Sequence, residues 1–238
     1  MTVESRAEAP TRRERQRQQT RAEIKDRAMG QVAGGGAGSV SLNAIARAMG
    51  MSPAALYRYF ASRDALLAEL VADACGSLAD ALRQAADGAP GPGAARLAAV
   101  AHAYRQWALA HPNSYLLVFQ TSSGSGLDPD PERTVAAAQR SMDVFLSVLD
   151  GPAAGHADLD LDEAGAGAEL AAQIRAWGLR AQTPDLPTGR LYLGLLTWTR
   201  LHGLISLELG HHLAATGVDP ALLYEAEVQS LLQRARLS

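Results

Sequence analysis

The chain has 238 residues, 47% of them hydrophobic, with a net charge of −3 and one cysteine, Cys75. That is enough for one large or two modest domains with a sizeable core, and a composition rich in Ala, Leu and Arg favours helices. The lone cysteine excludes an internal disulfide, no apolar run approaches the roughly 18 residues of a membrane helix, and the charged N-terminus has no apolar signal core, so we expect a soluble cytoplasmic protein.

The charge is unevenly distributed along the chain. Residues 1–63 carry 11 Lys/Arg and 5 Asp/Glu, a balance of +6, whereas residues 64–238 have a balance of −9. A basic end on an acidic body indicates a polyanion-binding segment attached to a part with another role, although a solvated basic helix would explain the charge equally well. We expect residues 1–11 to form a disordered basic arm.

The first predicted helix covers Thr11–Ala33. Its narrow apolar stripe consists of Ile24, Ala28 and Val32, and the rest is polar or charged. The run GGGAG at Gly34–Gly38 ends it. A phosphate-binding loop would continue with Gly-Lys-Ser/Thr, whereas Ser-Val follows here, so we interpret the run as a helix terminator and flexible turn.

The stretch SLNAIARAMGMSPAALYRYF, residues 41–60, predicts two short helices joined by a tight turn. Gly50 can adopt the left-handed conformation that ends a helix. Ser52 can cap the next helix, and Pro53 at its first position loses no hydrogen bond. Apolar residues at helical spacing give the first helix a buried face: Leu42, Ile45, Ala46 and Met49.

The second of these helices has small residues at its start, so it can approach the edges of DNA bases closely, as a recognition helix does in the major groove. Hydroxyls of Ser52, Tyr57 and Tyr59 can donate to phosphates, and the helix start at Ser62-Arg63 can hold another phosphate. The alternative is an ordinary helical hairpin with exposed tyrosines. The expected inward residues are Leu56, Tyr59 and Phe60, and the outward ones are Ala54, Ala55, Tyr57 and Arg58.

The remainder of the chain also predicts helices, separated by Gly- and Pro-rich breaks. An acidic, Gly-rich segment at 151–167 is expected to be a mobile excursion. No catalytic sequence motif of the Gly-x-Ser-x-Gly, His-Glu-x-x-His or Cys-x-x-Cys type occurs. The predicted helices are 62–86, 94–110, 111–120, 132–149, 168–180, 190–213 and 221–236.

The segment SLNAIARAMGMSPAALYRYFASRDALLAEL resembles the DNA-binding segment of the tetracycline-repressor (TetR) family, with the match running from about Arg12 to Leu70. The resemblance implies an all-α subunit, with a helix-turn-helix DNA-binding domain at 12–70 and a helical regulatory and dimerisation domain at 71–238. It also implies a homodimer that regulates transcription, usually a repressor released from its operator DNA by a small ligand.

Matched residue by residue, the resemblance assigns roles in DNA binding. A departure is the five-residue Gly/Ala run before Ser39, which suggests a looser hinge between the first two helices. Ser41 and Asn43 match positions that meet phosphate and base, Ala54, Tyr57 and Arg58 match base-facing positions, Ala55 and Tyr59 match phosphate-facing positions, and Arg63 matches a basic phosphate contact.

The later stretches HPNSYLLVF and WTRLHGLISLEL resemble the regulatory domain of one subgroup, in which Trp198-x-x-x-His202-Gly203 recurs. For any one aromatic residue of this part, core packing is the simpler interpretation, but as a set some should line an apolar pocket between helices. We expect a small apolar effector, no cofactor and no metal. The expected ligand-binding residues are Tyr104, Trp107, Phe119 and Phe145.

The sequence therefore predicts a dimeric, ligand-responsive DNA-binding regulator that acts as a repressor. Two alternatives remain: a helical enzyme with a basic arm, which would lack any recognisable catalytic motif, and a ligand-binding protein whose helix-turn-helix no longer works. A two-fold, four-helix interface is expected from apolar residues near the C-terminus. They are Leu191, Leu195, Leu196, Ile205 and Leu209 on one helix, with Leu223, Val228, Leu231 and Leu232 on the last.

Overall fold

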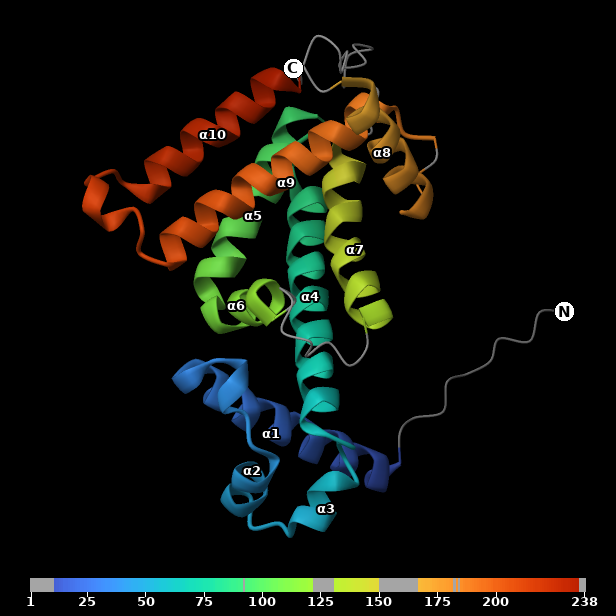
Figure 1. The fold of residues 1–238 in the computed structure, drawn as a ribbon, viewed down its shortest axis with the longest axis vertical. Coiled ribbons are helices and arrows are strands. Elements are labelled where there is room, and N and C mark those ends of the chain that lie inside the picture. Colours follow the sequence, from blue (N-terminus) through green and yellow to red (C-terminus); the bar gives the residue numbers. More distant parts are fainter. Residues whose placement is uncertain are drawn as a thin grey trace, which may run out of the picture. The chain divides into compact units, whose positions relative to one another are not determined.

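The computed structural model describes residues 11–91, 93–121, 131–149, 167–181, 183 and 185–235. Within these ranges the chain forms ten α-helices and two short 3₁₀ helices, η1 and η2, with no β-strand (Figure 1). The predicted all-α fold class is confirmed. The predictions of a disordered arm and of a mobile excursion at 151–167 lie outside the described residues, except for Thr11 and Gly167.

The chain divides into two compact units. Unit 1 comprises Met1–Val71 and Leu116–Asp130, and unit 2 comprises Ala72–Tyr115 and Pro131–Ser238. The sequence did not predict that residues 116–130 belong to unit 1. The periodicity of apolar residues indicates helices, but it does not show which helices pack together. Two helices, α4 and α6, contribute residues to both units.

Unit 1 is built around a helix whose start is fixed by a capping box. The Thr11 side chain accepts from the Glu14 backbone N–H at 3.3 Å, and the Glu14 carboxylate accepts from the Thr11 N–H at 2.7 Å. The stripe predicted for this helix is buried, with Ile24 and Ala28 both 0% exposed. The helices of unit 1 are α1 (Arg12–Gly35), η1 (Ala37–Ser39), α2 (Leu42–Ala48), α3 (Pro53–Tyr57) and the first residues of α4 (Arg63–Gly88).

The glycine-rich connection ends α1, as the sequence predicted, but two residues later than Ala33. Helix α1 continues through Gly34 and Gly35, and Gly36 caps it with a φ of 70° and a ψ of −177°, which suit glycine alone. The connection is also hydrogen-bonded, because Ser39 Oγ lies 2.6 Å from the carbonyl oxygen of Gln31 and 2.7 Å from that of Gly36. Gln31 Oε1 in turn accepts from the Ser41 N–H at 2.8 Å. The run therefore has a defined path held by these bonds.

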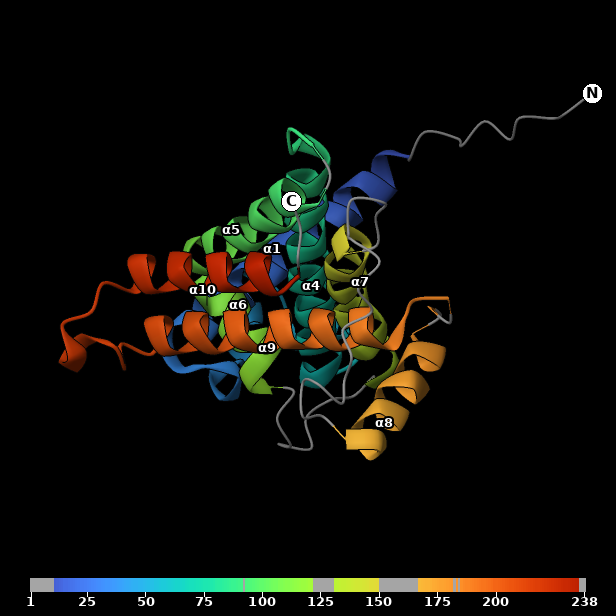
Figure 2. The same cartoon turned by 90° about the horizontal axis from the view of Figure 1, so that it is seen from above.

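Unit 2 is a larger helical assembly in which α9 packs against α5, α7, α8 and α10. Helices α9 and α10 lie side by side (Figure 2). Helix α9 ends four residues before the predicted Leu213, because Gly210 caps it and His211 takes a φ of 56°. The helices of unit 2, besides the rest of α4, are α5 (Ala94–Ala110), α6 (Pro112–Thr121, shared with unit 1), α7 (Pro131–Leu149), α8 (Gly167–Arg180), α9 (Thr188–Leu209), η2 (Ala214–Thr216) and α10 (Pro220–Arg234).

Part of the apolar surface that the sequence reasoning assigned to a dimer interface lies inside a single subunit. Leu191, Ile205, Val228 and Leu231 are each at most 2% exposed. Helices α9 and α10 pack on each other and on α5, and Leu191 packs in a cluster with Leu146 of α7 and Ile174 of α8. That part of the expectation was wrong, since spacing shows which residues share a face but not what covers it.

No helix among the described residues has the length and apolar character needed to cross a membrane.

Glycines allow the helices of unit 2 to approach closely. A Cβ added at Gly194 on α9 would lie 2.5 Å from Leu146 Cδ2 and 3.7 Å from Leu149 Cδ1, both on α7. A Cβ at Gly178 on α8 would lie 2.5 Å from Leu191 Cδ1. Both glycines are buried, so a larger side chain would have to displace packed leucines.

Replacing Gly194 should therefore overpack the α7–α9 contact. We expect Gly194→Val to lower the free energy of unfolding by about 1–3 kcal/mol. The matched control is Gly76→Val on α4, where an added Cβ meets nothing within 4 Å. Urea denaturation at one protein concentration measures both, and equal stabilities for the two variants would contradict the close packing.

Candidate nucleic-acid interface and effector groove

The turn between α2 and α3 has the geometry that the sequence predicted. Gly50 takes a φ of 64° after the end of α2, and Met51 N–H donates to Ala46 O at 2.9 Å. Ser52 is the N-cap of α3 and accepts from the Ala55 N–H at 3.2 Å, with Pro53 at the first helical position. Each element of the predicted turn is confirmed.

The residues around this turn separate into an inner and an outer face. Ile45, Ala46 and Leu56 are 0% exposed and Phe60 is 2% exposed, whereas the Tyr57 side chain is 48% exposed. Helix α3 is only five residues long, and the next residues form a turn whose amides still donate to Leu56 O. Of the remaining predicted DNA-facing residues, Asn43, Ser52, Ala54 and Arg58 are exposed and Ser41, Ala55 and Tyr59 are half-buried.

Arg21 on α1 is a central polar contact of unit 1 that the sequence reasoning missed. Its guanidinium donates to the Tyr59 carbonyl oxygen and to the Glu69 carboxylate, and it lies 4.4 Å from the centre of the Phe60 ring. Lys25 Nζ also approaches Glu69, at 3.1 Å. Burial alone would raise the pKa of Glu69, but hydrogen bonds from Arg21 and Lys25 lower it. The available signal was the position of Arg21 and Lys25 beside the apolar stripe of α1.

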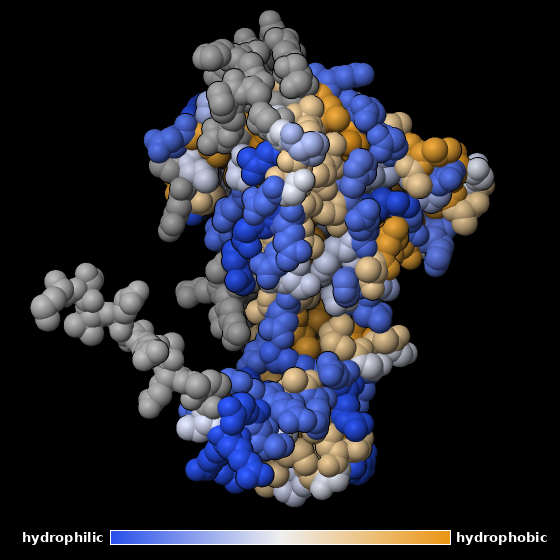
Figure 3. Space-filling view, turned by 180° about the vertical axis from the view of Figure 1, so that it is seen from behind, coloured by the Kyte–Doolittle hydropathy of each residue, from blue (hydrophilic) through white to orange (hydrophobic). Residues whose placement is uncertain are grey.

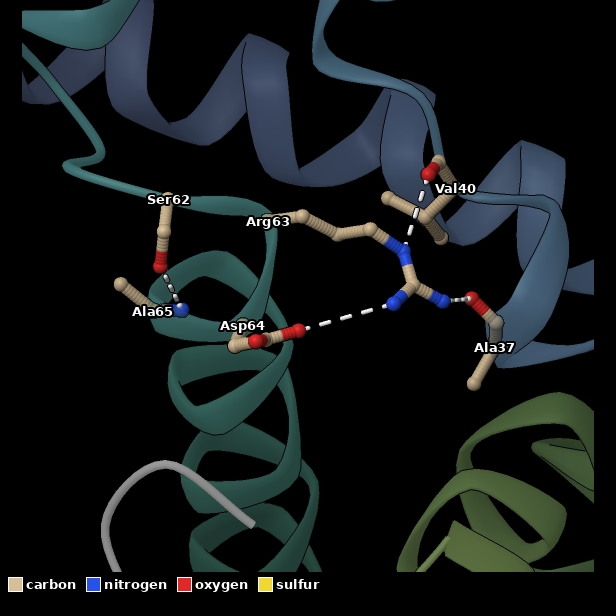
Figure 4. Close-up of polar contacts among 6 residues, drawn as sticks. All are labelled: Ala37, Val40, Ser62, Arg63, Asp64 and Ala65. Atoms are coloured by element: carbon tan, nitrogen blue, oxygen red, sulfur yellow. Dashed lines mark hydrogen bonds and ion pairs between the residues drawn. The ribbon is translucent and has the colours of Figure 1, made fainter. Parts of the chain in front are cut away.

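Arg63, the first residue of α4, has partners within unit 1 (Figure 4). Its Nε donates to Val40 O at 3.1 Å and its Nη2 donates to Ala37 O at 2.6 Å. Its Nη1 lies 3.5 Å from Asp64 Oδ1. Next to it, Ser62 Oγ accepts from the Ala65 N–H at 3.0 Å and so caps the start of α4. The phosphate contact expected of Arg63 stays a prediction.

The start of α1 supplies an exposed basic surface. Residues 11–19 are exposed throughout, and Arg12, Arg13, Arg15 and Arg17 lie among them. Figure 3 shows hydrophilic residues gathered over this part of the molecule. A surface of this kind attracts phosphates without reading base sequence.

Unit 2 has an open groove of about 770 Å³ along one face of α4. Trp107 lies beside α4, and its Nε1 donates to Ser77 Oγ at 3.0 Å. The lining mixes small apolar residues with acids and bases, so it suits a ligand with both polar and apolar parts. The lining residues are Ala72, Asp73, Gly76, Ser77, Asp80, Ala81 and Gln84 of α4, Trp107 and His111 at the end of α5, and Arg140 of α7.

Of the four aromatic residues expected to bind a ligand, only Trp107 lines this groove. Tyr104 and Phe145 are each 1% exposed and pack edge to face with ring centroids 5.8 Å apart, so they belong to the core of unit 2. Phe119 is half-buried in the part of α6 that belongs to unit 1. The sequence could not separate these residues, since aromatic side chains at helical spacing serve equally as core and as pocket lining.

The Trp198–His202 element forms a polar cluster inside unit 2. His202 Nδ1 lies 2.8 Å from the Tyr115 hydroxyl and 3.2 Å from the Tyr104 hydroxyl. The imidazole stacks on Tyr115 and on Trp198, with ring centroids 5.6 Å and 5.4 Å away. Burial lowers the pKa of His202, so the ring is neutral near pH 7. The ring is therefore held in unit 2 by both stacking and hydrogen bonds.

Cys75 is also a packing residue. It is 2% exposed, and burial raises the pKa of its thiol to about 11. Among the described residues, no three His, Cys, Asp or Glu side chains lie close enough together to hold a metal ion. The histidine pair His211-His212 is exposed just after the end of α9.

Comparison with known families gives two matches that together cover most of the chain. Residues 24–70 match the family described as bacterial regulatory proteins, tetR family. Residues 97–231 match the family described as tetracyclin repressor-like, C-terminal domain. The first match includes the turn between α2 and α3 and the residues that Arg21 contacts, Tyr59, Phe60 and Glu69. The second match includes most of unit 2.

Individual proteins agree with these matches. The HTH-type transcriptional regulator Rv1816 of Mycobacterium tuberculosis (strain ATCC 25618 / H37Rv) is 32% identical over 222 residues, which cover 91% of this chain and 92% of that protein. The crystal structure of the regulatory protein SCO4313 is 41% identical, with a TM-score of 0.77, and covers 94% of this chain and 100% of that one. FadR of Bacillus subtilis, solved in complex with stearoyl-CoA, shares the fold at 12% identity and a TM-score of 0.59, covering 89% of this chain and 97% of its own.

Proposed function

The chain belongs to the TetR family of HTH-type transcriptional regulators, and from this premise we propose that it is a homodimeric repressor that a small effector releases from its operator. The observation that carries the proposal is the exposed face formed by α3 and its C-cap, where Ala54, Tyr57 and Arg58 are all exposed. Because the target is chromosomal DNA, the protein would act in the cytoplasm.

The exposed side chains of unit 1 suggest a division of labour on DNA. Arg58 and Asn43 have the donors and acceptors that read base edges, and Ala54 lets the backbone come close to them. Tyr57 also lies on this face. The proposed phosphate contacts come from Ser41, Ser52, Ala55 and Tyr59, together with the arginines at the start of α1.

The caps Ser41 and Ser52 can serve both the fold and the DNA. Each uses an oxygen lone pair to accept a backbone N–H, from Ala44 at 3.3 Å and from Ala55 at 3.2 Å. A hydroxyl also carries one proton that it can donate. That proton is available to a phosphate oxygen without loss of the cap, so the two roles are compatible.

Apolar residues on α9 and α10 support the proposed homodimer. Leu207 is 42% exposed and Leu222 is 70% exposed in the single subunit. Leu195, Leu196 and Leu232 are half-buried. Two such helix pairs related by a two-fold axis would form a four-helix interface and cover this surface.

The groove beside Trp107 is the proposed effector site. Its α4 lining runs from Ala72 to Gln84, and the same helix begins at Arg63 in unit 1. A ligand that favours one position of α4 would therefore act on a helix that also carries part of the DNA-binding unit. The mixed lining argues for an effector that also carries polar groups, whereas the sequence suggested a small apolar one. Tyr104 and Phe145 would support the site from the core, and Phe119 does not line the groove.

The proposed function is tested by selecting DNA from a pool of random duplexes with the purified protein. A dimer presents two recognition elements, so the selected sequences should share a near-palindrome with half-sites about one helical turn apart, about 34–36 Å, or somewhat more. Light scattering should show a dimer at micromolar concentration. A monomer that selects no sequence would refute the proposal.

Base reading is tested at Arg58 and Asn43. Either Arg58→Ala or Asn43→Ala should lose about 1–3 kcal/mol of discrimination at particular base pairs, because a base-edge hydrogen bond is removed. The control is Arg83→Ala, which removes an exposed arginine of α4 in unit 2 that pairs with Asp80. The measurement is a competition assay against every single-base variant of the operator; a uniform loss across variants would assign these residues to the phosphate backbone.

The effector groove is tested at Trp107. Trp107→Ala and the milder Trp107→Phe should leave operator affinity nearly unchanged but raise the effector concentration needed for release, with Trp177→Ala on α8 as control. If effector binding weakens operator binding about 100-fold, the coupling is about 2.7 kcal/mol, and operator DNA must weaken effector binding by the same factor. The readout is titration of the operator complex with a compound found to release the wild type. Release of both Trp107 variants at the wild-type concentration would place the effector elsewhere.

A further inference from the structure

The connection from α1 to α2 needs contacts with other residues to fix its conformation, because its own sequence leaves the backbone flexible. Four of the five residues from Gly34 to Gly38 are glycine, which loses more backbone freedom on folding than any other residue. At its far end Val40 is 4% exposed, and Ser41 caps α2 directly after it. Whatever fixes this connection also fixes where α2 begins.

Arg63 fixes the connection from the side of α4. Its Nε and Nη2 donate to two carbonyl oxygens, those of Val40 and Ala37, which stand on either side of Ser39. A guanidinium presents its N–H groups in one rigid plane, so it holds two acceptors in a set geometry. Figure 4 shows the side chain reaching from the start of α4 to both carbonyl groups.

We propose that Arg63 is a positioning residue for DNA recognition: by holding Ala37 O and Val40 O it fixes α2, with Ser41 and Asn43, relative to the start of α4. The inference rests on the DNA-binding function proposed above. It differs from a phosphate contact, because it needs the planar fork of arginine and not merely its positive charge. Through these two hydrogen bonds, the first residue of the long helix α4 is linked directly to the segment that leads into α2.

The distinguishing variant is Arg63→Lys, which keeps the charge and loses the fork. Affinity is measured for the selected operator and for a scrambled duplex of equal length, over a series of salt concentrations. We expect operator affinity to fall about tenfold or more and scrambled-duplex affinity to fall less than about threefold, with the slope of log K against log salt unchanged. Arg27→Lys, the same change at an exposed arginine of α1, is the control and should match the wild type.

The opposite role gives a different pattern. If Arg63 acts through a phosphate, Arg63→Lys binds both duplexes like the wild type, while Arg63→Gln weakens both equally and reduces the slope by about 0.9. That result would overturn the positioning role. Ser39→Ala offers a second route, since it loosens the same connection without a change of charge and should also reduce the preference for the operator over the scrambled duplex.

A measurement without DNA separates this inference from the proposed function. In Arg63→Lys, hydrogen exchange at the amides of Ser39, Val40 and Ile45 should become about tenfold faster or more, while amides in the core of unit 2 keep their protection. Unchanged exchange at these amides would refute the inference even if the protein binds its operator. A wild-type protein that prefers no duplex would instead refute the function, and the exchange data would still decide what Arg63 holds.

Discussion

Close packing of α2 against the α3 segment is the constraint on which unit 1 depends. The contact is made by Ile45, Ala46 and Leu56, which are inaccessible to solvent, and Ala46 is small enough for the second helix to cross over it. A unit of this size buries a modest share of its surface, so apolar contacts alone leave it marginal. The two inward-facing arginines complete it: Arg21 ties α1 to the end of the recognition segment, and Arg63 ties α4 to the path into α2.

The features of unit 1 that could be predicted are those that depend on residues close together in the sequence. A left-handed glycine at position 50, a serine cap at 52 and a proline at 53 each act within one turn of the chain, so their order in the sequence is enough to identify the turn. The same holds for the stripe of Ile24, Ala28 and Val32. The burial of these residues followed from spacing alone, and so did the exposure of Tyr57 and Arg58.

The contacts that could not be predicted join residues far apart in sequence. Arg21 meets acceptors 38 and 48 residues away, and Arg63 meets carbonyl groups 23 and 26 residues away. Every residue type has a backbone carbonyl, so the sequence cannot show which carbonyl groups accept hydrogen bonds from the Arg63 guanidinium. The positive charge of Arg63 suggested a phosphate contact instead. The same limit applies in unit 2, where residues of α4, α5 and α7 form the groove. Only the packing of these three helices shows that Trp107 lines the groove and that Tyr104 lies in the core.

Cys75 gives this protein a practical advantage for spectroscopy. It is the single cysteine of the chain, it is buried, and a thiol pKa of about 11 leaves only about one thiol in 10⁴ ionised at pH 7. A maleimide reagent will therefore react far faster with a cysteine introduced on the exposed face of α3, for example by Ala54→Cys, than with the native one. Two such labels in a dimer, one on each subunit, would report the separation of the two recognition elements directly, without any need to remove the native thiol.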